Sequence, residues 1–273
     1  GRSLPWFQIG RPPPTGTQAI TVRQLLTHTS GMPRDSRLTD FDRLFQPSRE
    51  AAIAALPEQE LESSPGTSVA YSNLGYALLG EVIQAASGTT YSAYLRRNLL
   101  GPLEMHGTLV HPDPDDDTAW GHGPLDGAGR RAKAGFWELR FATPAGGMAA
   151  SVPDLARFMM DALAPYRGQD PTLLSRTAMR SMHEVQVAID PARGGMGLGW
   201  AVEVSSGQHV VYHGGELPEQ TAFLMLDLNG LIGVVVLTNA QDADVDGIAQ
   251  EALRIVREAV LDATVVVPAR AIP

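Results

Sequence analysis

The sequence predicts an α+β protein in which a helical region comes first and an antiparallel sheet closed by a helix comes last. Two observations carry this prediction. Apolar residues recur with a helical period through the middle of the 273 residues, and with the period of strands in the last third. We expect one domain over 1–273, with a mostly helical lobe at 20–165 and antiparallel strands with a C-terminal helix at 195–265.

Capping residues indicate where the helices begin and end. Thr21 and Gln24 have the spacing of a capping box, in which each side chain bonds the other residue's backbone N–H. Gly88 follows an apolar run at helical spacing, and Ser151 precedes another with a proline in its first turn. These signals predict helices near 21–26, 48–57, 74–86, 91–100 and 151–163, with an irregular surface excursion over 111–135.

Short alternating runs in the last third are typical of strands. They lie at 199–204, 209–212, 221–228 and 231–237. Asn229-Gly230 stands between the last two runs and predicts a tight two-residue hairpin. A final helix is expected over about 245–261, with one apolar face made of Ile248, Ala252, Ile255 and Ala259.

Composition argues against several kinds of partner. The net charge of −9 disfavours nucleic acid, because phosphate binding needs clustered Lys and Arg. The chain has no cysteine and its seven histidines are scattered along it, so we expect no metal and no cofactor. No apolar run approaches the ~20 residues that span a bilayer, so no membrane span is expected.

Tyr71-Ser72-Asn73 begins an apolar helical run and contains residue types that acyl transfer uses. Such chemistry needs a base to take a proton from the attacking hydroxyl and an acid to return it to the leaving group. A tyrosine whose pKa is lowered by nearby cations can do both, and an asparagine two residues on can bind a substrate amide. The tripeptide also fits a plain helix start, in which Ser72 or Asn73 caps and Tyr71 packs.

His213-Gly214-Gly215 follows an apolar run with strand character. A cationic or hydrogen-bonding side chain there can polarise a substrate carboxylate or the tyrosine, and the glycines let a substrate backbone approach closely. The backbone N–H of Glu216 can form half of an oxyanion hole. The alternative is a turn that carries an exposed histidine.

These two motifs belong to a longer series of segments that occur in a fixed order along the chain. They are 25–33 (LLTHTSGMP), 71–76 (YSNLGY), 144–148 (PAGGM), 154–158 (DLARF), 197–200 (GLGW), 213–215 (HGG) and 237–239 (LTN). This series resembles the serine β-lactamase-related family, which includes class C β-lactamases, D-Ala-D-Ala carboxypeptidases, D-aminopeptidases and esterases. The resemblance implies a β-lactamase/transpeptidase-like fold and a serine hydrolase that acts through an acyl-enzyme on ester, peptide or β-lactam substrates.

The resemblance also implies roles for single residues. Tyr71 would be the general base and later the acid, and Asn73 would contact the substrate. His213 stands where many members have lysine. Gly215 would lie against the substrate, and Glu216 would give its backbone N–H to the acyl oxyanion.

Two further points follow from the resemblance. His28 and Ser30 are expected to be structural and to pack a turn beneath the cleft. Because histidine is mostly neutral at pH 7, His213 should hold a carboxylate less firmly than lysine does, which favours an ester- or peptide-cleaving member over a dedicated β-lactamase. Family members of this kind are periplasmic or secreted, and a cytoplasmic location stays open.

One part of the family pattern is absent. The Ser-x-x-Lys helix should precede the LLTHTSG segment, but Lys133 is the single lysine and Arg130 stands three places before it. Residues 4–7 (LPWF) resemble the stretch that follows that helix. The chain also starts without methionine and shows no signal peptide, so we expect a processed or truncated chain. N-terminal elements of the fold, including the nucleophile, should be missing and should leave an apolar trench that a separate fragment could fill.

Two functions are therefore open. In the first, the protein is a serine hydrolase whose nucleophile lies upstream, and this chain is inactive without it. In the second, it is a non-catalytic pseudoenzyme or scaffold with the same fold. The presence of Tyr71, Asn73 and His213 together favours the first, with a small molecule or peptide as substrate.

Overall fold

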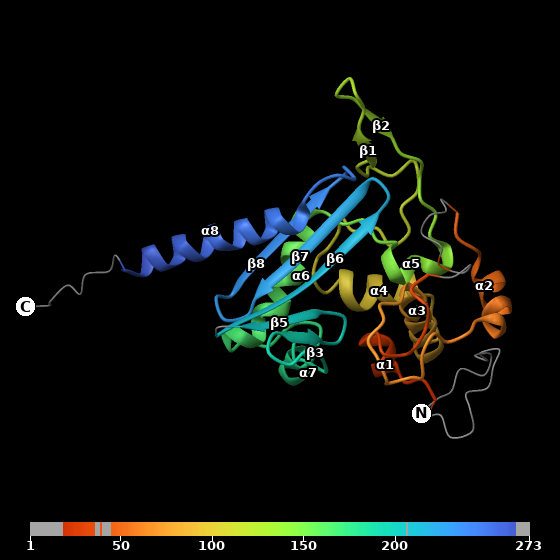
Figure 1. The fold of residues 1–273 in the computed structure, drawn as a ribbon, viewed down its shortest axis with the longest axis horizontal. Helices are drawn as coiled ribbons and strands as arrows, with labels where there is room; N and C mark the ends of the chain where they lie inside the picture. The colour runs from red at the N-terminus through yellow and green to blue at the C-terminus, as the bar shows by residue number, and fades with distance from the viewer. Residues whose placement is uncertain (1–18, 36–38, 40–44, 206, 266–273) are drawn as a thin grey trace, which may run out of the picture.

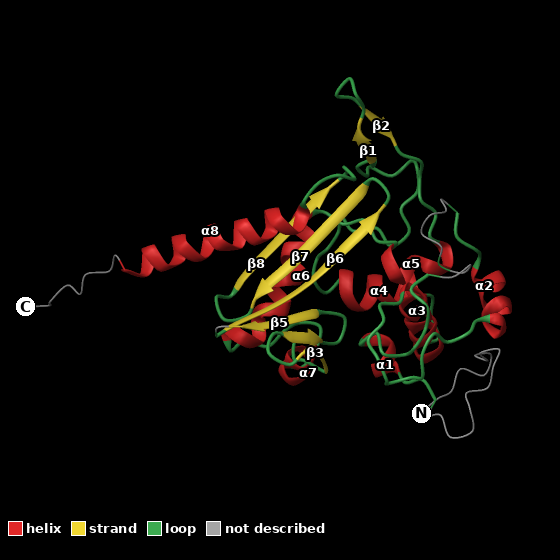
Figure 2. Cartoon of the chain, in the orientation of Figure 1, coloured by secondary structure: helices red, strands yellow, loops and turns green. Residues whose placement is uncertain are grey.

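The computed structural model describes residues 19–35, 39, 45–205 and 207–265. Helices gather on one side of the molecule and a six-stranded antiparallel sheet forms the other, with further helices against the sheet (Figure 1). The colouring by secondary structure in Figure 2 separates the two parts clearly. The α+β fold class is confirmed, whereas residues 4–7 lie outside the described residues.

Most helices begin and end at the capping residues that the sequence indicates. Both hydrogen bonds of the predicted capping box form between Thr21 and Gln24, and Gly88 ends its helix in the left-handed conformation, with φ 71°. Ser151 caps a helix that contains a proline in its first turn. The helical elements are α1 Val22–Leu26, α2 Arg49–Ala55, η1 Leu56–Glu58, α3 Asn73–Ser87, α4 Tyr91–Leu95, η2 Arg96–Leu100, η3 Arg140–Ala142, α5 Thr143–Gly146, α6 Val152–Leu163, η4 Ala164–Arg167, α7 Arg176–Met182 and α8 Val245–Val265.

The sheet is a simple meander in which each strand pairs antiparallel with the next. Its strands are β3 Val187–Asp190, β4 Gly194–Met196, β5 Ala201–Ser205, β6 Gln208–Leu217, β7 Gln220–Asp227 and β8 Ile232–Thr238. All four predicted strand runs are confirmed as β5 to β8. The sequence did not predict β3 and β4, because two of the three β4 residues are glycine and give no alternating pattern.

Two local predictions are wrong. The β7–β8 loop has four residues rather than two, because Asp227 pairs with Ile232 across it. The Asp227 carboxylate sits inside this wider loop and accepts hydrogen bonds from the backbone N–H groups of Asn229 and Gly230. The excursion at 111–135 is also not wholly irregular, since it contains a two-stranded antiparallel sheet, β1 His122–Leu125 and β2 Arg131–Lys133.

The sheet is covered on both faces because its central strands alternate. Val211 and Leu226 point to the face where α6 packs, and Val210 and Met225 point to the face where Leu253 of α8 packs. Figure 1 shows α8 running beside the sheet toward the C-terminus. Within the described residues, no helix is both long and apolar enough to cross a bilayer.

The apolar face of α8 predicted from the sequence is not the face that meets the sheet. Val245, Ala249 and Leu253 are the buried residues, whereas Ile248 and Ile255 are each 52% exposed. The helix carries apolar residues on two faces, so the periodic pattern alone does not select the one that meets the sheet.

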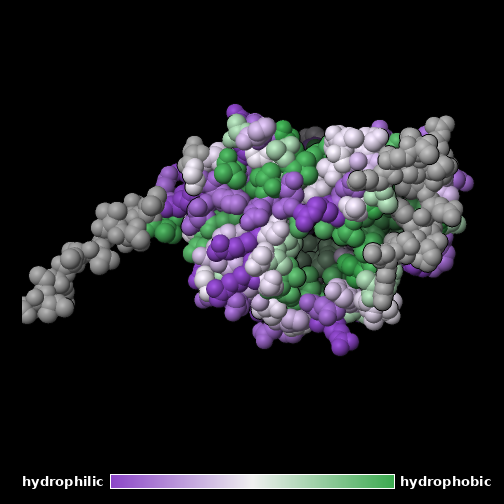
Figure 3. Space-filling model, turned by 90° about the horizontal axis from the view of Figure 1, so that it is seen from below, coloured by the Kyte–Doolittle hydropathy of each residue, from purple (hydrophilic) through white to green (hydrophobic). Residues whose placement is uncertain are grey.

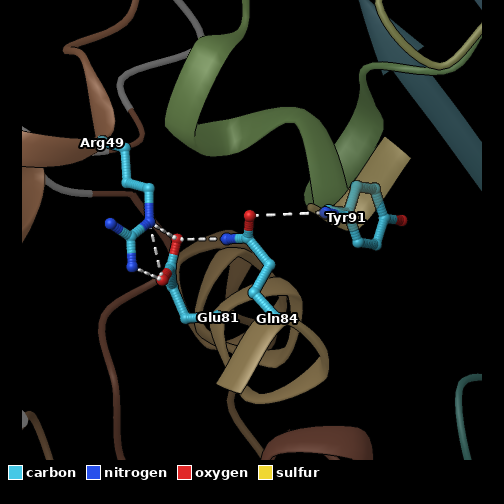
Figure 4. Close-up of polar contacts among 4 residues, drawn as sticks. All are labelled: Arg49, Glu81, Gln84 and Tyr91. Carbon is cyan, nitrogen blue, oxygen red and sulfur yellow. Dashed lines mark hydrogen bonds and ion pairs between the residues drawn. The ribbon is translucent and has the colours of Figure 1, made fainter. Parts of the chain in front are cut away.

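A buried carboxylate joins three helices of the helical lobe (Figure 4). Glu81 of α3 is 4% exposed and receives the Arg49 guanidinium of α2, with an Nη2–Oε2 distance of 2.6 Å. Gln84 donates to the same carboxylate at 2.9 Å and accepts from the backbone N–H of Tyr91 at 3.3 Å. The lobe therefore depends on a charged group that is costly to bury without its partners.

We expect Arg49→Met to lower the free energy of unfolding by about 1–3 kcal/mol, because it leaves the Glu81 carboxylate buried without its cation. Urea denaturation measures this. Arg176→Met is the matched control, because its partner Asp170 has an 85% exposed side chain and the pair should contribute less than about 1 kcal/mol. Equal losses in the two variants would contradict the role of burial.

His183 is fully buried beneath the sheet. Its ring lies 5.4 Å from that of Trp200 and its Nδ1 lies 3.2 Å from the Tyr166 hydroxyl. Burial lowers the pKa of His183 from 6.5 to about 4, and the charge of His209 acts in the same direction. The folded protein therefore keeps this side chain neutral in mildly acidic solution.

We expect His183 to make the protein less stable as pH falls from 6.5 to about 4, because only the unfolded chain takes up its proton in that window. The contribution is roughly 3 kcal/mol at the acid end and is absent above the unfolded pKa. His183→Asn should flatten the slope of unfolding free energy against pH by about one proton. An unaltered slope in the His183→Asn variant would refute the assignment.

Candidate active site

The site is built on the N-terminus of α3. Ser72 is the capping residue, whose Oγ accepts from the backbone N–H of Gly75 at 2.9 Å and donates to the Pro33 carbonyl at 2.7 Å. Ser72 is 1% exposed, so its hydroxyl is committed to structure. Ser72 therefore caps the helix, as one of the two sequence interpretations predicted. The residues on either side of it, Tyr71 and Asn73, line the cleft.

His28 lies beneath this helix start. Its Nδ1 accepts from the backbone N–H of Ser72 at 3.0 Å, and its ring packs between those of Tyr71 and Tyr76 at centroid distances of 4.3 and 4.9 Å. His28 is 1% exposed, and burial, followed by the charge of His213, lowers its pKa to about 4. The prediction that His28 packs a turn beneath the cleft agrees with this geometry.

Tyr71 stands between two histidines and is 37% exposed. Its ring centroid lies 4.3 Å from that of His28 and 6.3 Å from that of His213. Burial raises the pKa of Tyr71 above its usual value, the charge of Arg34 opposes that rise, and Asp35 adds to it. The lowered tyrosine pKa that a general base needs is therefore not found, because the effect of burial outweighs that of the Arg34 charge.

His213 lies inside β6 rather than after it. β6 runs on to Leu217, so Gly215 and Glu216 continue the ladder opposite Ala222 and Thr221 of β7. All three predicted residues of this strand line the cleft. Burial lowers the pKa of His213, with a smaller opposing effect from the Gly214 backbone, so the imidazole is neutral at pH 7.

Asn73 is held by two residues that the motif analysis missed. Its side-chain Nδ2 donates to Asp35 at 2.7 Å, and its backbone N–H donates to the Arg34 carbonyl at 2.9 Å. Arg34 in turn lies over the Tyr71 ring, with its Cζ 5.2 Å from the centroid. In the sequence, only the position of Arg34 and Asp35 directly after the LLTHTSGMP segment could have indicated that they belong to the site.

A cleft of roughly 2040 Å³ separates the helical side from the sheet and opens beside Tyr71 and His213. Pockets for small ligands occupy about 300–1,000 Å³, so this cleft exceeds what one small molecule fills. The space-filling view shows a hollow between the two parts with apolar residues on its walls (Figure 3). Polar residues such as Asn239 and Gln220 also line the cleft, so its walls are apolar only in part.

The serines that the structure describes near this site are engaged in structure. Ser30 is 1% exposed and accepts from the Met32 N–H, and Ser151 caps α6. The ammonium of Lys133 lies over the Trp120 ring, 3.4 Å from its centroid. Within the described ranges, no group of His, Asp or Glu side chains could hold a metal ion.

The segments around this site match known proteins. Residues 3–257 match the model of the family described as Beta-lactamase. The chain is 28% identical over 230 residues to Protein flp of Staphylococcus aureus (strain MRSA252), covering 81% of this chain and 43% of that protein. It therefore spans less than half the length of this curated relative.

Two solved structures share the fold. The octameric penicillin-binding protein homologue from Pyrococcus abyssi superposes with a TM-score of 0.75 at 28% identity, over 88% of this chain and 56% of that one. A D-stereospecific amidohydrolase from Streptomyces sp. gives 0.69 at 25% identity, over 85% and 72%. With a family model that matches most of its length and this shared fold, the chain belongs to the Beta-lactamase family, whose members are serine hydrolases.

Proposed function

We propose that the chain forms the proton-transfer and substrate-binding wall of a serine hydrolase that cleaves esters or peptides through an acyl-enzyme. In this proposal Tyr71 is the general base and then the acid, and His213 polarises it or the substrate. Asn73, Gly215 and Glu216 contact the substrate. The observation that carries the proposal is that Tyr71, just before α3, and His213 of β6 face one cleft with ring centroids 6.3 Å apart, although they are far apart in the sequence.

The chemical argument for the pair is one of proton transfer. A hydroxyl that attacks a carbonyl must lose its proton to a nearby base, and the leaving group must regain one. A neutral imidazole beside Tyr71 can accept or donate a hydrogen bond without adding charge to the site. Asn73 lies two residues after Tyr71, at the first position of α3, and lines the same cleft.

We propose that the nucleophile comes from polypeptide outside the residues described. Ser30 and Ser72 are buried and hydrogen-bonded, and neither has a lysine one helical turn on. The size of the cleft supports this proposal, because it leaves room for a helix beside Tyr71 as well as for a substrate. The chain taken alone is then inactive.

A non-catalytic role for the same fold is the second candidate. The raised pKa of Tyr71 favours it, since a tyrosine of this kind is a weaker base at pH 7 than one beside a lysine. The shared cleft position of Tyr71, Asn73 and His213 favours catalysis instead. Covalent labelling of a longer parent protein with a fluorescent penicillin or a fluorophosphonate decides between the two, because only a catalyst forms the adduct.

We expect this chain alone to form no adduct with a fluorophosphonate and to release no burst of chromophore from nitrocefin or p-nitrophenyl acetate. Among the described residues, Ser30 and Ser72 are buried and hydrogen-bonded, and Ser151, which lines the cleft, caps α6. Intact mass spectrometry and stopped-flow absorbance measure the two quantities. Release of chromophore equal to the protein concentration would show that a nucleophile is present after all.

In a parent protein that carries the nucleophile, we expect Tyr71→Phe to lower kcat by about 10²–10⁴-fold, because it removes the proton-transfer group. KM should change much less, since the ring and its contacts with His28 remain. Tyr212→Phe is the matched control, because Tyr212 lines the same cleft but stacks on Phe223. Similar activities of the two variants would remove Tyr71 from the mechanism.

A further inference from the structure

The loop at residues 33–35 is fastened to the start of α3. Ser72 donates to the Pro33 carbonyl, the Asn73 backbone donates to the Arg34 carbonyl, and the Asn73 side chain donates to Asp35. Two of these hydrogen bonds fix the backbone carbonyls of Pro33 and Arg34 at the edge of the cleft, and the third fixes the Asp35 side chain. The side chain of Arg34 is therefore presented from a held backbone rather than from a free loop.

Arg34 is the cation beside Tyr71 in the part of the chain that the structure describes. Its Cζ lies 5.2 Å from the Tyr71 ring centroid, a cation–π distance. The two histidines that flank the tyrosine, His28 and His213, both have pKa values lowered by burial and are neutral at pH 7. Among the described residues beside Tyr71, the positive charge therefore comes from the Arg34 guanidinium.

The guanidinium has capacity left for a ligand. Its Nε lies 3.5 Å from the Asp35 carboxylate, a loose pair, and the Arg34 side chain is 72% exposed. Exposed pairs of this kind contribute little, so an incoming anion loses little by competing with it. The terminal nitrogens of arginine form a planar fork that matches a carboxylate. Arg34 also lines the cleft itself.

We propose that Arg34 is the anion-binding residue of this site and holds a carboxylate of the substrate beside Tyr71. The inference rests on the proposed function and narrows its substrates to acyl donors that carry a free carboxylate. It assigns to Arg34 the charge that His213 does not supply. Asp35 then has two tasks, because it orients Asn73 through one oxygen and Arg34 through the other.

Binding of a small carboxylate to this chain tests the proposal without any turnover. We would label tyrosine rings with ¹³C, identify the Tyr71 signals with Tyr71→Phe, and titrate with N-acetylalanine and separately with its neutral amide. The carboxylate should shift the Tyr71 signals in a saturable way and bind at least about tenfold more tightly than the amide. Arg34→Gln should abolish this preference, and Arg34→Lys should keep part of it because the charge remains.

Arg140→Gln is the matched control. Arg140 also lines the cleft and the substitution removes the same charge, but its guanidinium is engaged by Glu138 at 2.7 Å. It should leave the preference for the carboxylate unchanged. The proposal is overturned if the unaltered chain shows no preference, if Arg34→Gln retains it, or if both arginine variants lose it equally.

The outcome is separable from that of the proposed function. A parent protein without hydrolase activity would leave a measured Arg34-dependent preference intact, because binding involves no nucleophile. Conversely, the parent protein can be active while Arg34→Gln changes neither the KM for the carboxylate form of an ester nor the KM for its amide form. That result would refute only the anion-binding role.

Discussion

The contact between His28 and the start of α3 is the constraint on which the site depends. The backbone N–H of Ser72 donates to His28 Nδ1, and the imidazole fills the space between Tyr71 and Tyr76. His28 adopts a φ of 56°, a conformation that a non-glycine residue holds only when its surroundings impose it. A strained and buried residue is therefore fixed by a hydrogen bond and two ring contacts, and Tyr71 is placed as a result.

The same segment also joins the two halves of the molecule. The carbonyl of Leu26 accepts from the Tyr76 hydroxyl of the helical lobe and from the backbone N–H of Gly199 next to the sheet. Gly199 has a φ of 83°, where glycine is favoured, and a Cβ there would meet the Tyr76 hydroxyl at 3.3 Å. Because Leu26 and His28 are two residues apart, the relative position of the lobes and the position of Tyr71 are set by one turn.

Residue patterns that act over a few positions predicted helix ends correctly. The predictions failed where the sequence was compatible with two arrangements. The capping box at Thr21 and the glycine at 88 specify helix ends through bonds made within a few residues, and both form. The face of α8 was not predictable, because either apolar stripe could meet a sheet. Arg34 and Asp35 belong to no motif, and only the fold brings them to Tyr71 and Asn73.

Burial drives every titratable group at the centre of the site toward its neutral form. It lowers the pKa values of His28 and His213 and raises that of Tyr71, so none of the three carries charge at pH 7. A neutral tyrosine is a poor base, and a neutral histidine attracts no anion. The charge that acyl transfer requires must then come from the rim of the cleft or from whatever enters it.

Arg34 already supplies such a charge, because it opposes the rise in the Tyr71 pKa. A second cation that entered the cleft beside Tyr71 would add to that effect and bring the phenol closer to the range of a working base.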